Sequence, residues 1–187
     1  MRLSLPRRIA MQQLGAALLL PLVIGLGPSG SASAEEAGSW RFYRNATPAF
    51  TVLYPQTLSA RHVGKRLGAD TMLVEEWRLP EGAGDIQLTV TDRPAGGSVA
   101  DWIKSQVGGN AVPIDIASMR GATVESLSDG VYAIAIYLDE TTSGKVIGFT
   151  LSMRNVPPGT TLAQAKSRYR PRATDFWRMV ESIKIGG

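Results

Sequence analysis

His62 is the residue best suited to acid–base chemistry, because it is the single histidine among the 187 residues of the chain. The chain also has no cysteine, which excludes disulfides, thiolate metal sites and cysteine nucleophiles. A zinc site would need His62 together with carboxylates, a smaller set of ligands than zinc usually has. The neighbours Arg61, Lys65 and Arg66 carry positive charges that disfavour a bound cation. We therefore expect an ordinary surface histidine and no metal site.

Serine and glycine motifs that support catalysis or phosphate binding are also missing. A serine nucleophile needs a base, an acid and a strained turn, and the sequence has neither G-x-S-x-G nor G-x-x-x-x-G-K-[ST]. Gly96 and Gly97 precede a predicted helix, where an anion could bind at the helix start. Their spacing is not that of a dinucleotide-binding motif, and it favours an ordinary loop.

Paired carboxylates occur twice, at Glu75–Glu76 and at Asp139–Glu140. Neighbours on a strand point to opposite faces, so the first pair cannot easily share a substrate. The second pair falls in a predicted hairpin turn, where we expect solvated side chains. These observations favour a protein that is not an enzyme and needs no cofactor, with an unrecognised hydrolase as the less favoured alternative.

The most distinctive polar feature is a basic segment, residues 166–172. In an extended conformation its four cations would lie on one side, since strand side chains alternate. Such a surface could bind carboxylates or phosphates of an acidic protein or an anionic lipid surface. The alternative is a solvated connector between two helices, with cations paired to acids such as Asp175. The candidate partner-binding residues are Lys166, Arg168, Tyr169, Arg170 and Arg172.

Hydrophobic periodicity indicates which elements position these residues. Alternating apolar residues predict eight strands. Both faces of the strand at 131–138 are apolar, so we expect it to be central and covered on both sides. The predicted strands are residues 40–43, 50–54, 72–77, 86–91, 112–116, 123–127, 131–138 and 145–153.

Helix-capping patterns predict three helices. Ser98, with Asp101 three residues later, starts one that ends before the glycines at 108–109. Thr161 with Gln164 forms a capping box for a helix to about residue 168. Pro171 then interrupts, and the last helix begins at residue 174 or 175. The economical arrangement is an α+β fold, a twisted and mainly antiparallel sheet flanked by helices.

Residues 1–34 have the pattern of a cleavable bacterial signal peptide. Three arginines, at positions 2, 7 and 8, precede a nearly uncharged segment at 9–26, and small residues follow at 32–34. The adjacent arginines also suit twin-arginine export, an alternative to the general secretion route. A retained membrane anchor is disfavoured because Pro21 and several glycines weaken the apolar segment. We expect a periplasmic or secreted protein without a membrane anchor after cleavage.

Residues 35–187 have the length of one domain. Three of the 20 basic residues lie in the predicted leader, which leaves 17 against 16 acidic residues, a net charge of +1. This balance gives no support for a nucleic-acid partner, which usually requires a clustered basic surface.

Three short segments of this domain resemble a known family. Residues 50–55 (FTVLYP) resemble the opening motif of this family. Residues 86–90, followed by 98–102, resemble its strand and the capped helix after it, and residues 176–183 resemble its closing helix. The family is that of the photosystem II extrinsic protein PsbP and its DcrB-like and Mog-like relatives, which are α/β/α sandwiches. The chain departs from it after Pro55, where the tryptophan of the family's opening is absent.

The resemblance implies an accessory protein that docks on a larger assembly, because the shared motifs are structural rather than catalytic. We therefore expect a non-enzymatic domain that binds another envelope protein or assembly of unknown identity. The alternative is a small-ligand or lipid carrier with a pocket between the sheet and the helices.

Overall fold

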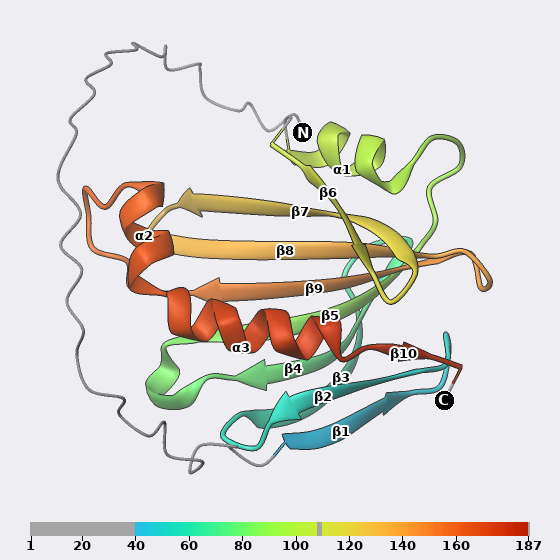
Figure 1. Ribbon diagram of the computed structural model, residues 1–187, viewed down its shortest axis with the longest axis horizontal. Coiled ribbons are helices and arrows are strands. Elements are labelled where there is room, and N and C mark those ends of the chain that lie inside the picture. The colour runs from blue at the N-terminus through green and yellow to red at the C-terminus, as the bar shows by residue number, and fades with distance from the viewer. Residues whose placement is uncertain (1–39, 108–109, 187) are drawn as a thin grey trace, which may run out of the picture. The chain divides into compact units, whose positions relative to one another are not determined.

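The computed structural model describes residues 40–107 and 110–186 (Figure 1). The predicted leader at 1–34 lies outside these residues. The strands are β1 (Trp40–Asn45), β2 (Phe50–Pro55), β3 (Ser59–Arg66), β4 (Thr71–Arg78), β5 (Gly84–Asp92), β6 (Val112–Ile116), β7 (Met119–Ser128), β8 (Val131–Glu140), β9 (Lys145–Met153) and β10 (Lys184–Ile185). The helices are α1 (Val99–Val107), α2 (Leu162–Arg168) and α3 (Arg170–Glu181), with a 3-10 turn, η1, at Pro80–Gly82.

The strands form two antiparallel sheets. Seven lie in the order β3-β4-β5-β9-β8-β7-β6, and three form a small sheet in the order β1-β2-β10. Both chain ends of the described domain contribute to the small sheet, because Lys184 pairs with Thr51 and Ile185 with Phe50. The predicted antiparallel α+β architecture is confirmed, with the addition of this second sheet.

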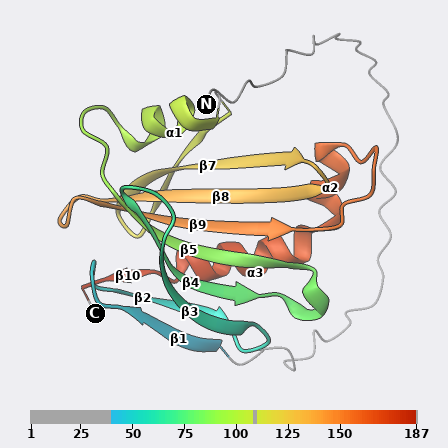
Figure 2. The ribbon, with the colours of Figure 1, turned by 180° about the vertical axis from the view of Figure 1, so that it is seen from behind.

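The main hydrophobic core covers one face of the seven-stranded sheet. Alternate residues of β5, β8 and β9 point into it, and α2, α3 and the small sheet lie over them (Figures 1 and 2). Trp77 of β4 is fully buried where the two sheets meet, with its ring 5.5 Å from Tyr43 and 5.6 Å from Tyr54. Phe149 and Phe176 are also fully buried, on β9 and α3. This packing of aromatic side chains joins the small sheet and α3 to the large sheet.

A second, smaller core lies on the opposite face of the large sheet, under α1. Val99 and Ile103 of the helix are buried in a cluster with Val124 of β7. Trp102 contacts Tyr137 of β8 edge-on at 5.7 Å. The predicted start of this helix is confirmed, since the Asp101 amide donates to Ser98 Oγ at 3.1 Å. Helices therefore lie on both faces of the sheet.

The covering of β8 is less complete than predicted. Tyr132, Ile134, Ile136 and Leu138 are all buried against the main core. On the other face Ala133 and Ala135 are only partly buried, because α1 packs near the Tyr137 end of the strand and leaves these small residues accessible. The prediction that both faces are fully covered is wrong for this half of the strand.

Two strands and one helix boundary differ from the sequence predictions. Strand β3 has almost no buried residue and is interrupted by a bulge between His62 and Lys65, so it lacks an alternating pattern. Strand β10 has only two residues. Helix α3 begins at Arg170 rather than at 174 or 175, because Pro171 lies in its first turn, where the absent N–H is not needed.

No helix within residues 40–107 and 110–186 has the length and apolar character needed to cross a bilayer.

The buried position of Trp77 predicts a large effect on stability. We expect Trp77→Ala to lower the free energy of unfolding by about 3–5 kcal/mol, because it removes the aromatic packing between the two sheets and leaves a cavity. The matched control is Phe42→Ala, since Phe42 is 77% exposed, and we expect a change within about 0.5 kcal/mol. Urea unfolding followed by circular dichroism measures both; equal losses would contradict this account of the core.

Gly121 predicts a second, backbone-determined effect. A Cβ atom at this position would lie 2.1 Å from the carbonyl oxygen of Tyr137 on the paired strand, a contact that only a shift of the backbone can relieve. We expect Gly121→Ala to destabilise the protein by about 1–3 kcal/mol. Gly68→Ala is the control, because a Cβ there meets nothing within 4 Å. A thermal melt that ranks the two variants in the reverse order would refute the predicted strain.

Candidate functional site

The basic segment, residues 166–172, is helical and not extended. Lys166 and Arg168 end α2, Tyr169 joins the two helices, and Arg170 and Arg172 begin α3. Helical residues two positions apart point to nearly opposite sides. The predicted alignment of the four cations along one side of an extended chain is therefore wrong.

Lys166 and Tyr169 attach α2 to the sheet. Lys166 Nζ lies 2.9 Å from Glu125 Oε2 on β7, and the Tyr132 hydroxyl donates to the same oxygen at 3.2 Å. The rings of Tyr169 and Tyr132 stack at 5.9 Å with an interplanar angle of 13°. Burial, the Glu125 charge and the hydrogen bond all raise the pKa of Tyr132. These contacts give Lys166 and Tyr169 a structural role, whether or not a partner also contacts them.

The other cations of the segment differ in exposure. Arg168 is exposed and lies over the Tyr169 ring at 5.6 Å, and Arg170 is exposed. Neither makes an ion pair with another described residue. Arg172 is half-buried and lines a narrow space of about 40 Å³ with Asp175. Arg168 and Arg170 are thus the members of the predicted set that remain most available to a partner.

His62 is exposed, as expected, but it has one specific neighbour. Its Nδ1 lies 3.3 Å from Glu75 Oε2, and the side chains are 77% and 6% exposed. Burial raises the pKa of Glu75, while the hydrogen bond and charge of His62 act in the opposite direction. Burial and the Glu75 charge raise the pKa of Tyr43 to about 12. Glu76 lies on the opposite face of β4 from Glu75, and its Oε1 is 3.0 Å from Arg78 Nε.

No group of three or more histidine, aspartate or glutamate side chains that could hold a metal ion occurs in the part of the chain that the structure describes.

Asp139 and Glu140 are buried, so the prediction that they are solvated turn residues is wrong. Strand β8 continues through both, with 8% and 4% of each residue exposed. Glu140 accepts hydrogen bonds from the amides of Thr142 and Ser143 at 3.0 and 2.7 Å. Burial acts to raise the pKa of Glu140, but these hydrogen bonds and that of the Ser143 hydroxyl outweigh it, and the pKa lies below its usual value.

Asp139 lies in a cleft beside the start of α1, which we call the α1 cleft. Its volume is about 400 Å³, within the range of small-molecule sites. The loop after β5, the first residues of α1, the β6–β7 hairpin and the end of β8 surround it. The lining residues are Arg93, Gly97, Ser98, Val99, Ala100, Pro113, Ile114, Asp115, Arg120, Gly121 and Asp139.

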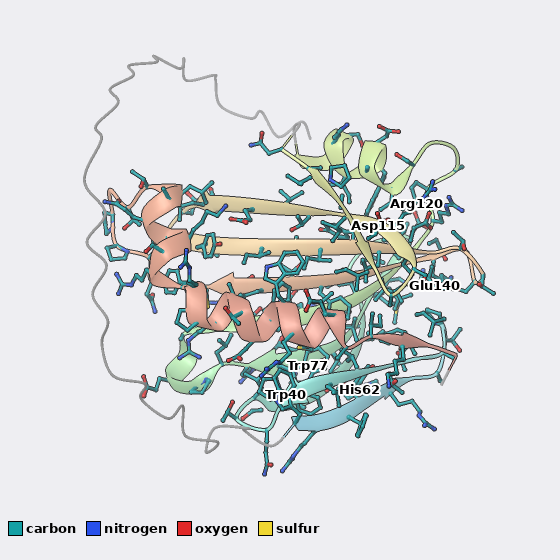
Figure 3. All side chains as sticks on the ribbon, in the orientation of Figure 1. Trp40, His62, Trp77, Asp115, Arg120 and Glu140 are labelled. Atoms are coloured by element: carbon teal, nitrogen blue, oxygen red, sulfur yellow. The ribbon has the colours of Figure 1, made fainter. Side chains whose placement is uncertain are left out.

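Charges of both signs line the α1 cleft. Arg93 Nη2 lies 3.0 Å from Asp139 Oδ2, whereas Asp139 Oδ1 is buried and has no hydrogen-bond partner among the described residues. Asp115 and Arg120 lie opposite each other in the strand register of the β6–β7 hairpin, and both are exposed. Their side chains are labelled at the end of the sheet away from α2 (Figure 3, compare Figure 1). The cleft and the basic segment are therefore separate regions of the surface.

A second polar cleft lies where β4 ends and β5 begins, with a volume of about 760 Å³. Arg154 Nη2 lies 2.5 Å from Asp85 Oδ2. Asp85 Oδ1 is buried and has no hydrogen-bond partner among the described residues. Arg78 and Glu76, which also line the cleft, pair with each other. Each of its two arginines thus already has a carboxylate partner, in contrast to Arg120 of the α1 cleft.

Sequence reasoning missed the α1 cleft because its charged residues come from three separate parts of the chain. The first part contributes Arg93, the second contributes Asp115 and Arg120, and the third contributes Asp139. These residues meet only because β6, β7 and β8 pair with one another and because the chain returns to them after β5. The one local signal was the Gly96–Gly97 pair before a capped helix, which was interpreted as an ordinary loop. No spacing rule connects that pair with Asp139.

Comparison with known proteins places this geometry in a known fold. No protein-family model and no curated protein matches the sequence. Among solved structures, cyanobacterial PsbP (CyanoP) from Synechocystis sp. PCC 6803 is similar, with a TM-score of 0.54, 18% identity, and coverage of 85% of this chain and 99% of that chain. A structure from Bacteroides thetaiotaomicron has a TM-score of 0.39 and 12% identity and covers 74% of this chain and 45% of that chain.

The similarity to CyanoP covers 85% of this chain, whose described residues form antiparallel sheets flanked by helices. At 18% identity it shows the fold alone. The resemblance drawn from the sequence is thereby confirmed at the level of architecture: this chain has a PsbP-like fold.

Proposed function

We propose that this protein is an exported, non-enzymatic accessory domain that binds another protein or assembly of the cell envelope. The observation that carries the proposal is the PsbP-like fold, since the resemblance to that family implies an accessory role. The packing between α3 and the sheet supports it, since Phe149 and Phe176 are fully buried there. The pocket lined by Phe176 and Ile86 measures about 40 Å³, well below the size of a ligand site.

The same observation weakens the alternative of an apolar carrier with a pocket between sheet and helices. Such carriers bind their ligands in preformed concave sites of several hundred Å³. The three clefts of that size found in the described part of the chain, of about 310, 400 and 760 Å³, lie elsewhere, and each has charged residues in its lining. The hydrolase alternative needs groups that converge on a reacting atom, and the exposed His62 has Glu75 alone as its ion-pair partner among the described residues.

The proposed docking surface is the basic segment at 166–172. Arg168 and Arg170 are exposed and able to bind carboxylates or phosphates in a two-pronged geometry. Lys166 and Arg172 lie in the adjoining turns and add to the local positive potential. The partner chemistry that fits is an acidic protein surface or an anionic lipid surface.

Removal of three arginines tests this surface. We expect the variant Arg168→Ala/Arg170→Ala/Arg172→Ala to recover its principal envelope partner at least about tenfold less well than the wild type, because charge-assisted contacts are lost. Affinity purification from envelope extracts with quantitative mass spectrometry measures the recovery. The control is Arg41→Ala/Arg44→Ala/Arg61→Ala, which removes the same charge at exposed positions of β1 and β3. Equal losses in both triple variants would exclude a specific role for the segment.

Export is tested separately. We expect the chain expressed in a Gram-negative bacterium to reach the periplasm, with an intact mass that corresponds to a start at Glu35, because residues 32–34 suit a signal peptidase. Arg7→Lys/Arg8→Lys should leave export intact if the general secretion route is used and abolish it if the twin-arginine route is used. Recovery of the uncleaved wild-type chain from the cytosol would contradict the proposed location.

A further inference from the structure

The α1 cleft has features of a ligand site that the proposed docking function does not use. It is a concavity of about 400 Å³ between a helix start, a hairpin and the end of a central strand. The basic segment lies toward the other end of the sheet (Figures 1 and 3). A ligand in the cleft would therefore not depend on the docking surface.

Asp139 is the first group in the cleft that requires a partner. Its side chain is 90% buried, and among the described residues its one ion-pair partner is Arg93, which contacts Oδ2. Oδ1 is buried and has no hydrogen-bond partner among the described residues, and a buried acceptor without a donor is unfavourable. Because Asp139 lines the cleft, a ligand with an N–H donor supplies the missing hydrogen bond once a small rotation of the carboxylate brings this oxygen to the cleft surface.

Asp115 and Arg120 are the second feature. They face each other in the register of the β6–β7 hairpin, yet no ion pair joins their side chains. Both are exposed and line the cleft. Arg120 can bind an anionic group with two parallel hydrogen bonds, and Asp115 can attract a cationic group. The cleft thus offers one charge of each sign that has no ion-pair partner in the part of the chain that the structure describes.

The charge balance selects among ligand classes. Arg93 and Asp139 neutralise each other, and Arg120 and Asp115 contribute one positive and one negative charge, so the lining carries no net charge. A simple anion would satisfy Arg120 but leave Asp115 without a partner, and a simple cation would do the reverse. A ligand with one charge of each sign matches the lining and can also supply a donor near Asp139.

We propose that the α1 cleft binds a small zwitterion with a carboxylate and an ammonium group, of the class of free amino acids and dipeptides. The carboxylate is bound by Arg120. The ammonium group lies toward Asp115 and Asp139 and donates hydrogen bonds to their carboxylates. The apolar wall contributed by Val99, Ala100, Pro113 and Ile114 contacts the remainder of the ligand.

Four matched probes test the proposal on the wild-type protein. They are L-alanine, L-alanyl-L-alanine, N-acetyl-L-alanyl-L-alanine and L-alanyl-L-alanine amide. The third lacks the ammonium group and the fourth lacks the carboxylate, so each removes one half of the proposed recognition. Titration followed by ¹H–¹⁵N NMR measures affinity and shows which backbone amides respond.

We expect at least one zwitterion to shift the amides of residues 97–100 and of the β6–β7 hairpin. Both blocked dipeptides should bind at least about tenfold more weakly, a loss expected when a charged group goes unpaired. Stronger binding of L-alanine assigns free amino acids as the ligand, and stronger binding of the dipeptide assigns peptides. The proposal is wrong if the blocked compounds bind as well as the zwitterions, or if no probe shifts these amides at about 10 mM, the range of weak binding.

A charge-neutral pair of substitutions supplies the protein-side test. Arg120→Gln/Asp115→Asn removes both unpaired charges at exposed positions and should weaken zwitterion binding at least about tenfold. The control, Arg44→Gln/Asp70→Asn, makes the same changes at exposed positions outside the cleft and should bind as the wild type does. Unchanged binding in the cleft variant would overturn the proposal. Partner recovery through the basic segment is a separate measurement, so this result and the docking result can fail independently.

Discussion

The structure depends on burying one apolar face of the seven-stranded sheet, and no single element is large enough to do this. Helix α3 covers the middle, where Phe149 and Phe176 are fully buried, and the small sheet covers the side near Trp77. Because burial of apolar area is the dominant favourable term in folding, both coverings are needed. The remaining face of the sheet is covered only in part, by α1, and this asymmetry leaves polar clefts at the surface of the fold rather than in its core.

The two regions considered for binding differ in how their charges are held. In the basic segment the cations project from two short helices, and those nearest the sheet, such as Lys166, are already engaged with Glu125. In the α1 cleft paired strands hold Asp115, Arg120 and Asp139 near one another. Fixed positions on strands allow selective recognition of a small molecule, whereas exposed arginines at a helix junction suit a broad contact.

The sequence predicted most elements because their patterns are local. The long apolar run at 145–153 and the capping box at Thr161 depend on neighbouring residues, and both match the structure. Strand β3 could not be predicted in this way, because it is an exposed edge strand with a bulge and buries almost nothing. The buried state of Asp139 was also hidden, since it depends on Arg93, which arrives from the end of another strand. The placement of Pro171 was misjudged because a proline that interrupts one helix can equally begin the next.

The pairing of β10 with β2 has a consequence for the timing of folding. Residues 184–185 complete a sheet whose other strands lie at 40–55, and Ser182 accepts a hydrogen bond from the Leu53 amide at 2.8 Å. During synthesis these contacts cannot form until almost the entire domain has left the ribosome. The nascent chain consequently lacks its full set of stabilising contacts throughout translation.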